Sequence, residues 1–292
     1  MILHLGLSLM LTVAQQNFDT VQVRTVKVGD GVYMLQGLGG NIGVSAGPDG
    51  VIIVDDQYAP LTDKIRAALA SLNPGPIRFV LNTHWHFDHT GGNENFGKAG
   101  VVIVAHENVR RRMSAEQFMT SFAQVVPASP SGALPVVTFT DTVTFYYNGD
   151  SITAFHVPPA HTDGDVIVWF RHANVVHMGD TFFNGRYPLV DIASGGASSG
   201  LIGAADRVLA MTNADTKIIP GHGPLGDRAA LQAYRTMLIT VRDRIKRAVA
   251  AGQTLAQVQA AKPTAEFDAV WGSGRITPPL FVEILYQDLS RR

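Results

Sequence analysis

The sequence predicts an α/β fold in which two sheets face each other and helices lie on the outside. Two observations predict it. A series of short strands followed by helices occurs twice along the chain. A hydrophobic content of 46% in 292 residues also supplies enough apolar material for one large layered core. We therefore expect a single domain over residues 17–292, built of two similar halves at about 17–135 and 136–292.

The first half begins with short apolar segments separated by glycine-containing turns, a pattern typical of antiparallel strands. These strands are expected at residues 21–28, 32–35, 43–45 and 51–54. A helix is expected at 60–72, because Leu61, Ile65 and Leu69 recur at helical spacing. The remaining elements of this half are expected to be a strand at 77–81, a short helix at 93–96, a strand at 101–105 and a helix at 107–113.

The regular succession of strand and helix patterns stops between the two halves, at residues 114–135. Residues 114–126 are compatible with a helix, whereas the proline-rich segment 127–135 predicts an irregular surface loop. A second series of strands is expected from residue 136 onward, at 142–147, 151–157, 166–170 and 175–178, followed by a helix at 202–211 and a strand at 217–220. Helices at 228–250 and 281–289 complete the chain. The helix at 228–250 is basic and amphipathic, and we interpret its apolar face as a core stripe rather than as a membrane or nucleic-acid surface.

The composition restricts the chemistry. A net charge of −1 argues against nucleic acid as the main partner. The chain contains no cysteine, which excludes disulfides, a thiol nucleophile and thiolate metal ligands. Any metal ligand must therefore be histidine, aspartate or glutamate.

The N-terminus gives the only indication of location. Residues 2–14 are mostly apolar, too short to span a bilayer and of the length of a signal-peptide core, with Ala14 at a suitable cleavage position. Residues 1–16 are therefore a candidate signal, which would make the protein periplasmic or secreted. The alternative is an ordered apolar segment in a cytoplasmic protein. Neither interpretation predicts stable insertion into a membrane.

The segment Asn82–Gly92 reads NTHWHFDHTGG and brings His84, His86, Asp88 and His89 within six residues. It follows an apolar run, so these side chains are expected where a buried strand emerges into a loop. Alternate side chains of an extended chain share a face, so His84 and His86 are placed to bind one metal while Asp88 and His89 face a second. Zinc accepts both imidazole and carboxylate ligands. The alternative is a polar loop that happens to be rich in histidine.

Further ligands are expected at later strand ends. His161 lies in PPAHTDGD, Asp180 in HMGDTFF and His222 in IIPGHGP, and each follows an apolar run. This ordered set resembles the metallo-β-lactamase superfamily over nearly the whole chain. The resemblance implies a four-layer αββα sandwich with the metal site at one edge between the sheets.

The same resemblance implies two zinc ions as cofactors. His84, His86 and His161 would bind the first, Asp88, His89 and His222 the second, and Asp180 would bridge them. Two such ions share a hydroxide that attacks a carbonyl, and Asp88 would be the catalytic residue that orients it. Asp55 and Asp56, at a preceding strand end, are candidates to support a ligand imidazole or to cap a helix. His106 is a weaker candidate for the same supporting role.

The implied function is zinc-dependent hydrolysis of a cyclic amide or ester in a small-molecule substrate, as in a β-lactamase. The alternative is a lactonase or a glyoxalase II-like thioesterase with little β-lactamase activity, because Asp180 replaces the cysteine of subclass B1 β-lactamases. A metal-binding protein without activity is a third reading. The expected substrate-binding residues are Phe87, Phe183, Arg186 and Tyr187, with Trp85 and Phe182 as further aromatic neighbours and the 38–41 and 194–200 loops as flanks. Arg186 is either a carboxylate anchor or an ordinary surface arginine.

Overall fold

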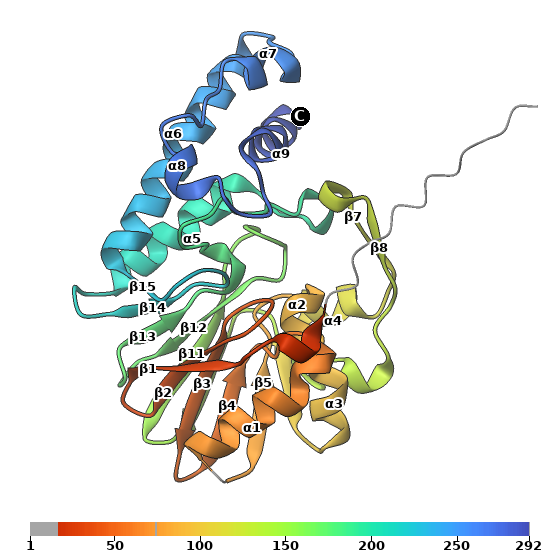
Figure 1. Cartoon of the computed structure of the whole chain (residues 1–292), viewed down its shortest axis with the longest axis vertical. Helices are drawn as coiled ribbons and strands as arrows, with labels where there is room; N and C mark the ends of the chain where they lie inside the picture. Colours follow the sequence, from red (N-terminus) through yellow and green to blue (C-terminus); the bar gives the residue numbers. More distant parts are fainter. Residues whose placement is uncertain (1–16, 74, 292) are drawn as a thin grey trace, which may run out of the picture.

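A computed structural model describes residues 17–73 and 75–291 and shows two sheets packed face to face with helices on both outer sides (Figure 1). The candidate signal at residues 1–16 lies outside the described residues. Within the described part, no helix is both long and apolar enough to cross a membrane. The predicted αββα layering is therefore confirmed.

The first sheet has seven strands in the order β1-β2-β3-β4-β5-β6-β9. Its strands are β1 (Arg24–Gly29), β2 (Val32–Gln36), β3 (Ile42–Gly47), β4 (Gly50–Val54), β5 (Ile77–Leu81), β6 (Val102–His106) and β9 (Val137–Phe139). The first four pair antiparallel, as expected from the short turns between them. From β4 to β9 the pairs are parallel, so the carboxyl ends of β4 and β5 lie at the same edge of the sheet.

The second sheet has six strands in the order β10-β11-β12-β13-β14-β15. Its strands are β10 (Thr142–Tyr147), β11 (Asp150–His156), β12 (Val166–Phe170), β13 (Val175–His177), β14 (Lys217–Ile219) and β15 (Gly226–Asp227). The β13–β14 pair is parallel, and β12 is antiparallel to both β11 and β13. Strands β11, β13 and β14 therefore run in the same direction and end at one edge.

Three apolar clusters correspond to the three interfaces between the four layers. The central cluster joins the inner faces of the sheets and includes Ile52 and Val54 of β4 together with Val166 and Val168 of β12. The other two clusters join each sheet to its outer helices. Complete burial of such a side chain contributes about 1.5–3 kcal/mol. The sheets are thus held rigidly enough to position the loops at their edge.

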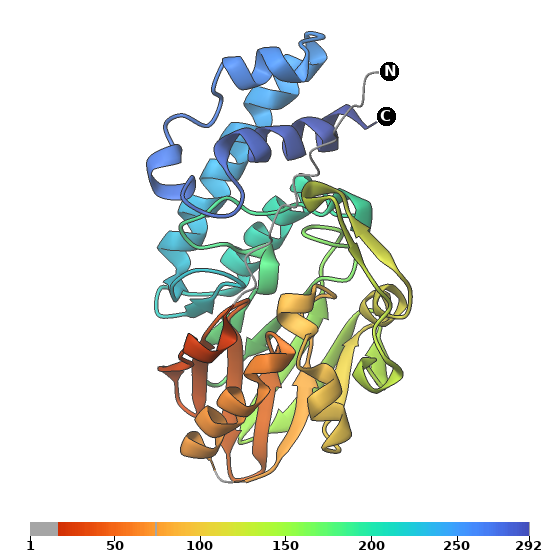
Figure 2. The same ribbon diagram turned by 45° about the vertical axis from the view of Figure 1, so that its right-hand side comes forward.

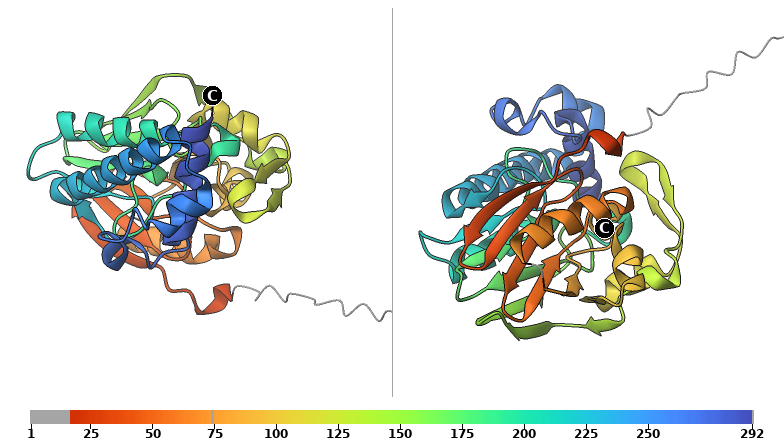
Figure 3. Two further views of the ribbon diagram at one scale, coloured as in Figure 1. Left: turned by 90° about the horizontal axis from the view of Figure 1, so that it is seen from above. Right: turned by 60° about the horizontal axis from the view of Figure 1, so that its bottom comes forward.

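The outer layers contain most of the helices. The helices are α1 (Thr62–Leu72), α2 (Phe87–Thr90), α3 (Asn93–Lys98), α4 (Glu107–Met113), α5 (Ser198–Met211), α6 (Arg228–Ala250), α7 (Leu255–Ala260), α8 (Asp268–Trp271) and α9 (Pro278–Ser290). Helices α1 and α3 cover the first sheet, and α5 and α6 lie side by side over the second (Figure 3).

Helix α6 buries one face, as the amphipathic pattern predicts. Leu231, Leu238 and Ile245 are buried against the second sheet and its neighbouring helices. On the other side, Arg235 pairs with Asp206 and Arg244 with Glu266. The interpretation of this helix as a core stripe with a solvated basic face is confirmed.

Two expectations for the middle of the chain are wrong. Residues 114–126 do not form a helix but a β-hairpin, in which β7 (Gln117–Met119) pairs with β8 (Gln124–Val126). Ala123 adopts a left-handed conformation with φ of 48°, which ends the short helical turn at Thr120–Phe122. The hairpin stands at the side of the sandwich and reaches towards the C-terminal helices (Figure 2).

The second error concerns the strand that begins the second half. Val137–Phe139 does not start the second sheet but pairs in parallel with β6 and closes the first sheet. The first sheet therefore ends after residue 139 rather than before residue 136. Sequence spacing cannot reveal this, because the apolar pattern of a short strand does not identify its partner.

Candidate metal centre

The candidate site lies at the edge of the sandwich where β5, β11, β13 and β14 end. His84, His86, Asp88 and His89 follow β5, and His161 follows β11. Asp180 follows β13 and His222 follows β14. Because these strands deliver their carboxyl ends to one edge, four segments far apart in the sequence meet there.

The structure brings all seven predicted side chains together in two groups. The first group contains His84, His86, His161 and Asp180, and the second contains Asp88, His89 and His222. Within each group, one nitrogen or carboxylate oxygen from every residue lies within 4.8 Å of all the others. Each group therefore has the residue types and the spacing needed to hold one metal ion.

Asp180 lies between the two groups. Its Oδ2 is 3.4 Å from Nε2 of His161 in the first group and 3.4 Å from Nε2 of His222 in the second. Its Oδ1 is 3.1 Å from Nε2 of His89. The carboxylate is thus placed to contact ions in both groups, as the resemblance implies.

Close backbone packing fixes this carboxylate. The residue before Asp180 is Gly179, whose φ is +51°. On the other side, a Cβ added at Gly221 would lie 2.0 Å from Oδ1 of Asp180. A Cβ added at Gly40 would similarly lie 2.1 Å from the ring of His89. Glycine is required at positions 40 and 221 because the backbone there passes directly against a candidate ligand.

Most of the histidines are oriented by a partner on the nitrogen that faces away from the site. Nδ1 of His89 lies 2.7 Å from Oδ2 of Asp55, and Nε2 of His86 lies 2.9 Å from Oδ2 of Asp191. Nδ1 of His161 lies 2.8 Å from the Leu189 carbonyl oxygen, and Nδ1 of His84 lies 3.0 Å from the Thr83 hydroxyl. Such contacts fix the tautomer and the ring orientation of metal-binding histidines.

The predicted supporting residues behave differently from one another. Asp55 supports His89, as anticipated. Asp56 accepts a hydrogen bond from the Gly92 amide and, among the described residues, forms no hydrogen bond or ion pair with a candidate ligand. His106 caps helix α4 by accepting from the Asn108 amide and stacks on His156, so it does not support the site. Asp191 was not anticipated, because its position after the apolar pair Leu189–Val190 carries no distinctive motif.

The electrostatics favour a cation in the first group. Nδ1 of His161 faces the Leu189 carbonyl oxygen and Nε2 of His86 faces the Asp191 carboxylate, so each of these nitrogens must carry the proton of its neutral ring. The other two ring nitrogens, Nε2 of His161 and Nδ1 of His86, are then acceptors, and they lie only 2.8 Å apart. Two facing acceptors repel unless a cation lies between them. Nε2 of His84 is buried and has no hydrogen-bond partner among the described residues. These observations fit a metal ion.

The second group has a high density of charge. Burial opposes the charged form of His222, but the carboxylates of Asp180 and Asp88 raise its pKa to about 9. Burial likewise opposes the charge on His89, and Asp180, Asp88 and Asp55 nevertheless raise its pKa well above the ordinary value. Without a metal, the raised pKa values therefore favour the protonated forms of both imidazoles.

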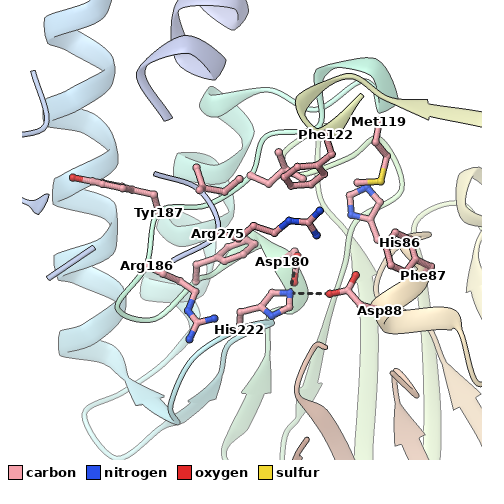
Figure 4. A pocket seen from close by; sticks show the side chains of 13 residues that line it. His86, Phe87, Asp88, Met119, Phe122, Asp180, Arg186, Tyr187, His222 and Arg275 are labelled. Carbon is pink, nitrogen blue, oxygen red and sulfur yellow. Dashed lines mark ion pairs between the residues drawn. The ribbon is translucent and has the colours of Figure 1, made fainter. Parts of the chain in front are cut away.

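A pocket opens over the two groups and encloses about 110 Å³. The four residues predicted to bind substrate, Phe87, Phe183, Arg186 and Tyr187, all line it. Figure 4 labels three of them, Phe87, Arg186 and Tyr187. The hydroxyl of Tyr187 points away from the pocket to Oδ1 of Asp268, at 2.8 Å, so only its ring contributes to the wall.

Other parts of the wall were not anticipated. Met119 and Phe122 come from the hairpin, and Arg275 and Ile276 come from the connection between α8 and α9. The hairpin lies in the segment whose sequence is compatible with a helix. Arg275 follows Gly272 and Gly274, which in the sequence indicate a turn but not a position in a pocket.

Several expected flanks lie behind the ligands rather than in the pocket. Trp85 donates to the Ser194 hydroxyl, and Phe182 packs on Tyr234. In the 38–41 turn, the side-chain amide of Asn41 donates to the carbonyls of Pro220 and Gly223. These segments position the ligand loops, and none of them is in the lining of the pocket.

Comparison with known proteins identifies relatives of this arrangement. The family model of the metallo-beta-lactamase superfamily matches residues 35–223. The 2,4-dinitroanisole O-demethylase subunit alpha of Nocardioides sp. is 28% identical over 171 residues, 57% of this chain and 46% of that protein. The hydroxyacylglutathione hydrolase of Rhodospirillum rubrum is 28% identical over 125 residues, 42% of this chain and 41% of that protein. The matched segment thus spans less than half of either relative.

The fold has solved counterparts. A metallo-beta-lactamase from Pontibacter korlensis superimposes with a TM-score of 0.62 at 20% identity, covering 74% of this chain and 99% of that one. At this identity the likeness shows the fold alone. The family model, however, covers about two thirds of the chain and includes all seven candidate ligands. This chain therefore belongs to the metallo-beta-lactamase superfamily.

Proposed function

We propose that this protein uses two zinc ions to hydrolyse the carbonyl group of a cyclic amide or ester, in the manner of a β-lactamase. The observation that carries the proposal is the pair of three-residue groups, His84, His86 and His161 on one side and Asp88, His89 and His222 on the other, with Asp180 between them at the floor of a pocket.

The donor set supports zinc. Each group offers imidazole nitrogens, and the two carboxylates supply oxygen, which is a common ligand combination for zinc in enzymes. Three residues of each group would hold one ion, and the carboxylate of Asp180, which lies between the groups, would contact both. When bound, two such ions lower the pKa of a water molecule and polarise the carbonyl that it attacks.

The chain's own residues supply orientation. Asp88 lines the pocket, and its side chain is 21% exposed, whereas that of Asp180 is 5% exposed. Burial opposes ionisation of Asp88, but His89 and His222 hold its pKa well below the usual range. Asp88 is therefore an ionised carboxylate that faces the pocket and can orient the attacking water by accepting its hydrogen bond.

The lining of the pocket supports direct attack by water. Among the described residues that line it, there is no serine, cysteine, threonine or lysine, so no ordinary acyl-enzyme nucleophile is present. The rings of Phe87 and Phe183 form apolar walls beside Asp88 and His222. These walls would limit the access of bulk water to the reacting carbonyl.

A lactonase or thioesterase is the second candidate. Asp180 stands where the resemblance places cysteine in subclass B1 β-lactamases, and its two oxygens face both groups. The likeness to a hydroxyacylglutathione hydrolase also favours this candidate. Under it, β-lactam hydrolysis would be slow or absent.

The experiment is a comparison of hydrolysis rates for a cephalosporin, an acyl homoserine lactone and an acyl-glutathione thioester with the zinc-loaded protein. The highest kcat/KM identifies the substrate class. His86→Ala and Asp88→Ala should abolish turnover while preserving the fold by circular dichroism. His172→Ala, at an exposed position away from the site, is the matched control and should keep full activity. Unchanged turnover in His86→Ala would refute the proposal.

A further inference from the structure

Arg275 lies at the mouth of the pocket, between α8 and α9. Figure 4 shows its guanidinium reaching into the pocket, with Phe122 on one side and the Asp180 and His222 side chains on the other. The residue lies outside residues 35–223, the segment shared with the superfamily. This cation is therefore a feature of this chain's C-terminal segment.

The side chain is held in place by an aromatic ring. Its Cζ lies 3.7 Å from the centroid of the Phe122 ring, a cation–π contact between the C-terminal segment and the β7–β8 hairpin. This contact orients the guanidinium but uses none of its N–H groups in a conventional hydrogen bond.

None of those N–H groups has an acceptor in the part of the chain that the structure describes. The arginines that form ion pairs are elsewhere in the molecule, at positions 111, 112, 235, 242, 244 and 291. Within residues 17–73 and 75–291, Arg275 makes neither an ion pair nor a hydrogen bond. An ordered guanidinium that faces a pocket with free donors is suited to bind an oxyanion.

The rest of the mouth adds positive charge. Arg186 lines the same pocket, and its Cβ would lie 3.0 Å from a Cβ added at Gly274, the neighbour of Arg275. The acidic residues in the described lining are Asp88 and Asp180, and both belong to the candidate metal groups. Two divalent ions would more than neutralise these carboxylates, so the pocket would attract anions.

We propose that the substrate carries a free carboxylate remote from the scissile carbonyl, and that Arg275 binds this carboxylate. The planar guanidinium offers two parallel N–H groups that match the two oxygens of a carboxylate. This contact would hold the substrate with its carbonyl over Asp88 and Asp180. The inference rests on the proposed hydrolytic function and specifies its substrate class.

The test uses a chromogenic cephalosporin as its free acid and as the methyl ester of the same carboxylate. Both are assayed with zinc-loaded wild type, Arg275→Gln and Arg275→Lys. Arg207→Gln is the matched control, because Arg207 is also exposed and lies 4.0 Å from the Phe155 ring, but outside the pocket. Thermal unfolding of each variant checks the fold.

For the acid, Arg275→Gln should raise KM about tenfold with little change in kcat, because a charge-assisted hydrogen-bond pair is lost on binding. Arg275→Lys should retain part of the affinity. The ester should bind wild type and Arg275→Gln equally, and Arg207→Gln should match wild type throughout. An equal effect of Arg275→Gln on acid and ester, or no effect on either, would overturn the inference.

Two further outcomes are also decisive. If Arg275→Gln does not fold, the inference is tested with Arg275→Lys and with the ratio of the wild-type KM values for the acid and the ester. A KM ratio of one contradicts the inference. If wild type hydrolyses neither compound, the proposed β-lactam hydrolysis fails. Carboxylate recognition is then measured by calorimetry as the Kd of acid and ester, where equal affinities would reject it independently.

Discussion

Asp55 Oδ2 lies 2.7 Å from Nδ1 of His89, and both side chains are fully buried. Asp55 also accepts from the amide and the hydroxyl of Thr83, the residue before His84. One carboxylate thus positions a histidine in each of the two metal groups. Its own backbone is left-handed, with φ of 65°, a conformation that aspartate tolerates better than most residues.

Asp55→Asn should therefore weaken zinc binding by about 10- to 100-fold, because the loss of a partner behind a ligand typically has this effect. Competition with a chromogenic chelator measures the affinity. Asp56→Asn is the matched control. Burial raises the pKa of Asp56 well above its usual value, so an amide resembles its neutral form and should leave zinc affinity unchanged. Equal losses in the two variants would argue against the role of Asp55.

Gly221→Ala should disrupt the site without touching a ligand. The added Cβ would lie 2.0 Å from Oδ1 of Asp180, so the carboxylate must move. We expect loss of bound zinc and of hydrolysis, measured by metal analysis and by turnover. Gly203→Ala is the control, because no atom lies within 4 Å of its added Cβ in helix α5. It should retain zinc and gain about 0.5–1 kcal/mol in stability.

Zinc binding should release protons. Without metal, the pKa of His222 is raised to about 9 and that of His89 is also raised, so both imidazoles are protonated at pH 7. A metal ion must displace these protons, and about two should be released per chain. Affinity should consequently rise as the pH increases towards 9. Calorimetry in buffers of different ionisation enthalpy gives the number released, and a binding enthalpy independent of the buffer would contradict this expectation.

Each candidate ligand is a histidine or aspartate in the connection that follows an apolar strand, so the sequence alone identifies the set as candidates. The strand ends converge for topological reasons that apply to any layered α/β fold. The resemblance that these motifs carry implies one centre for His84, His161 and His222, although His84 and His222 lie 138 positions apart in the sequence.

Other features depend on tertiary contacts that leave no local pattern. Asp191 resembles any aspartate in a loop until the fold places it 2.9 Å from His86. Val137–Phe139 looks like the first strand of the second sheet, and only its pairing with β6 shows otherwise. Arg275 lines the pocket because α9 packs back against α6, so the connection between α8 and α9 lies near the end of the sandwich (Figures 1 and 3).

The most direct test of the account is the number of zinc ions bound per chain after extensive dialysis. Elemental analysis should find two in wild type, one in His222→Ala and two in His172→Ala. Fewer than two ions in fully reconstituted wild type would contradict the dinuclear centre. Retention of two ions by His222→Ala would contradict the assignment of His222 as a ligand of the second zinc ion.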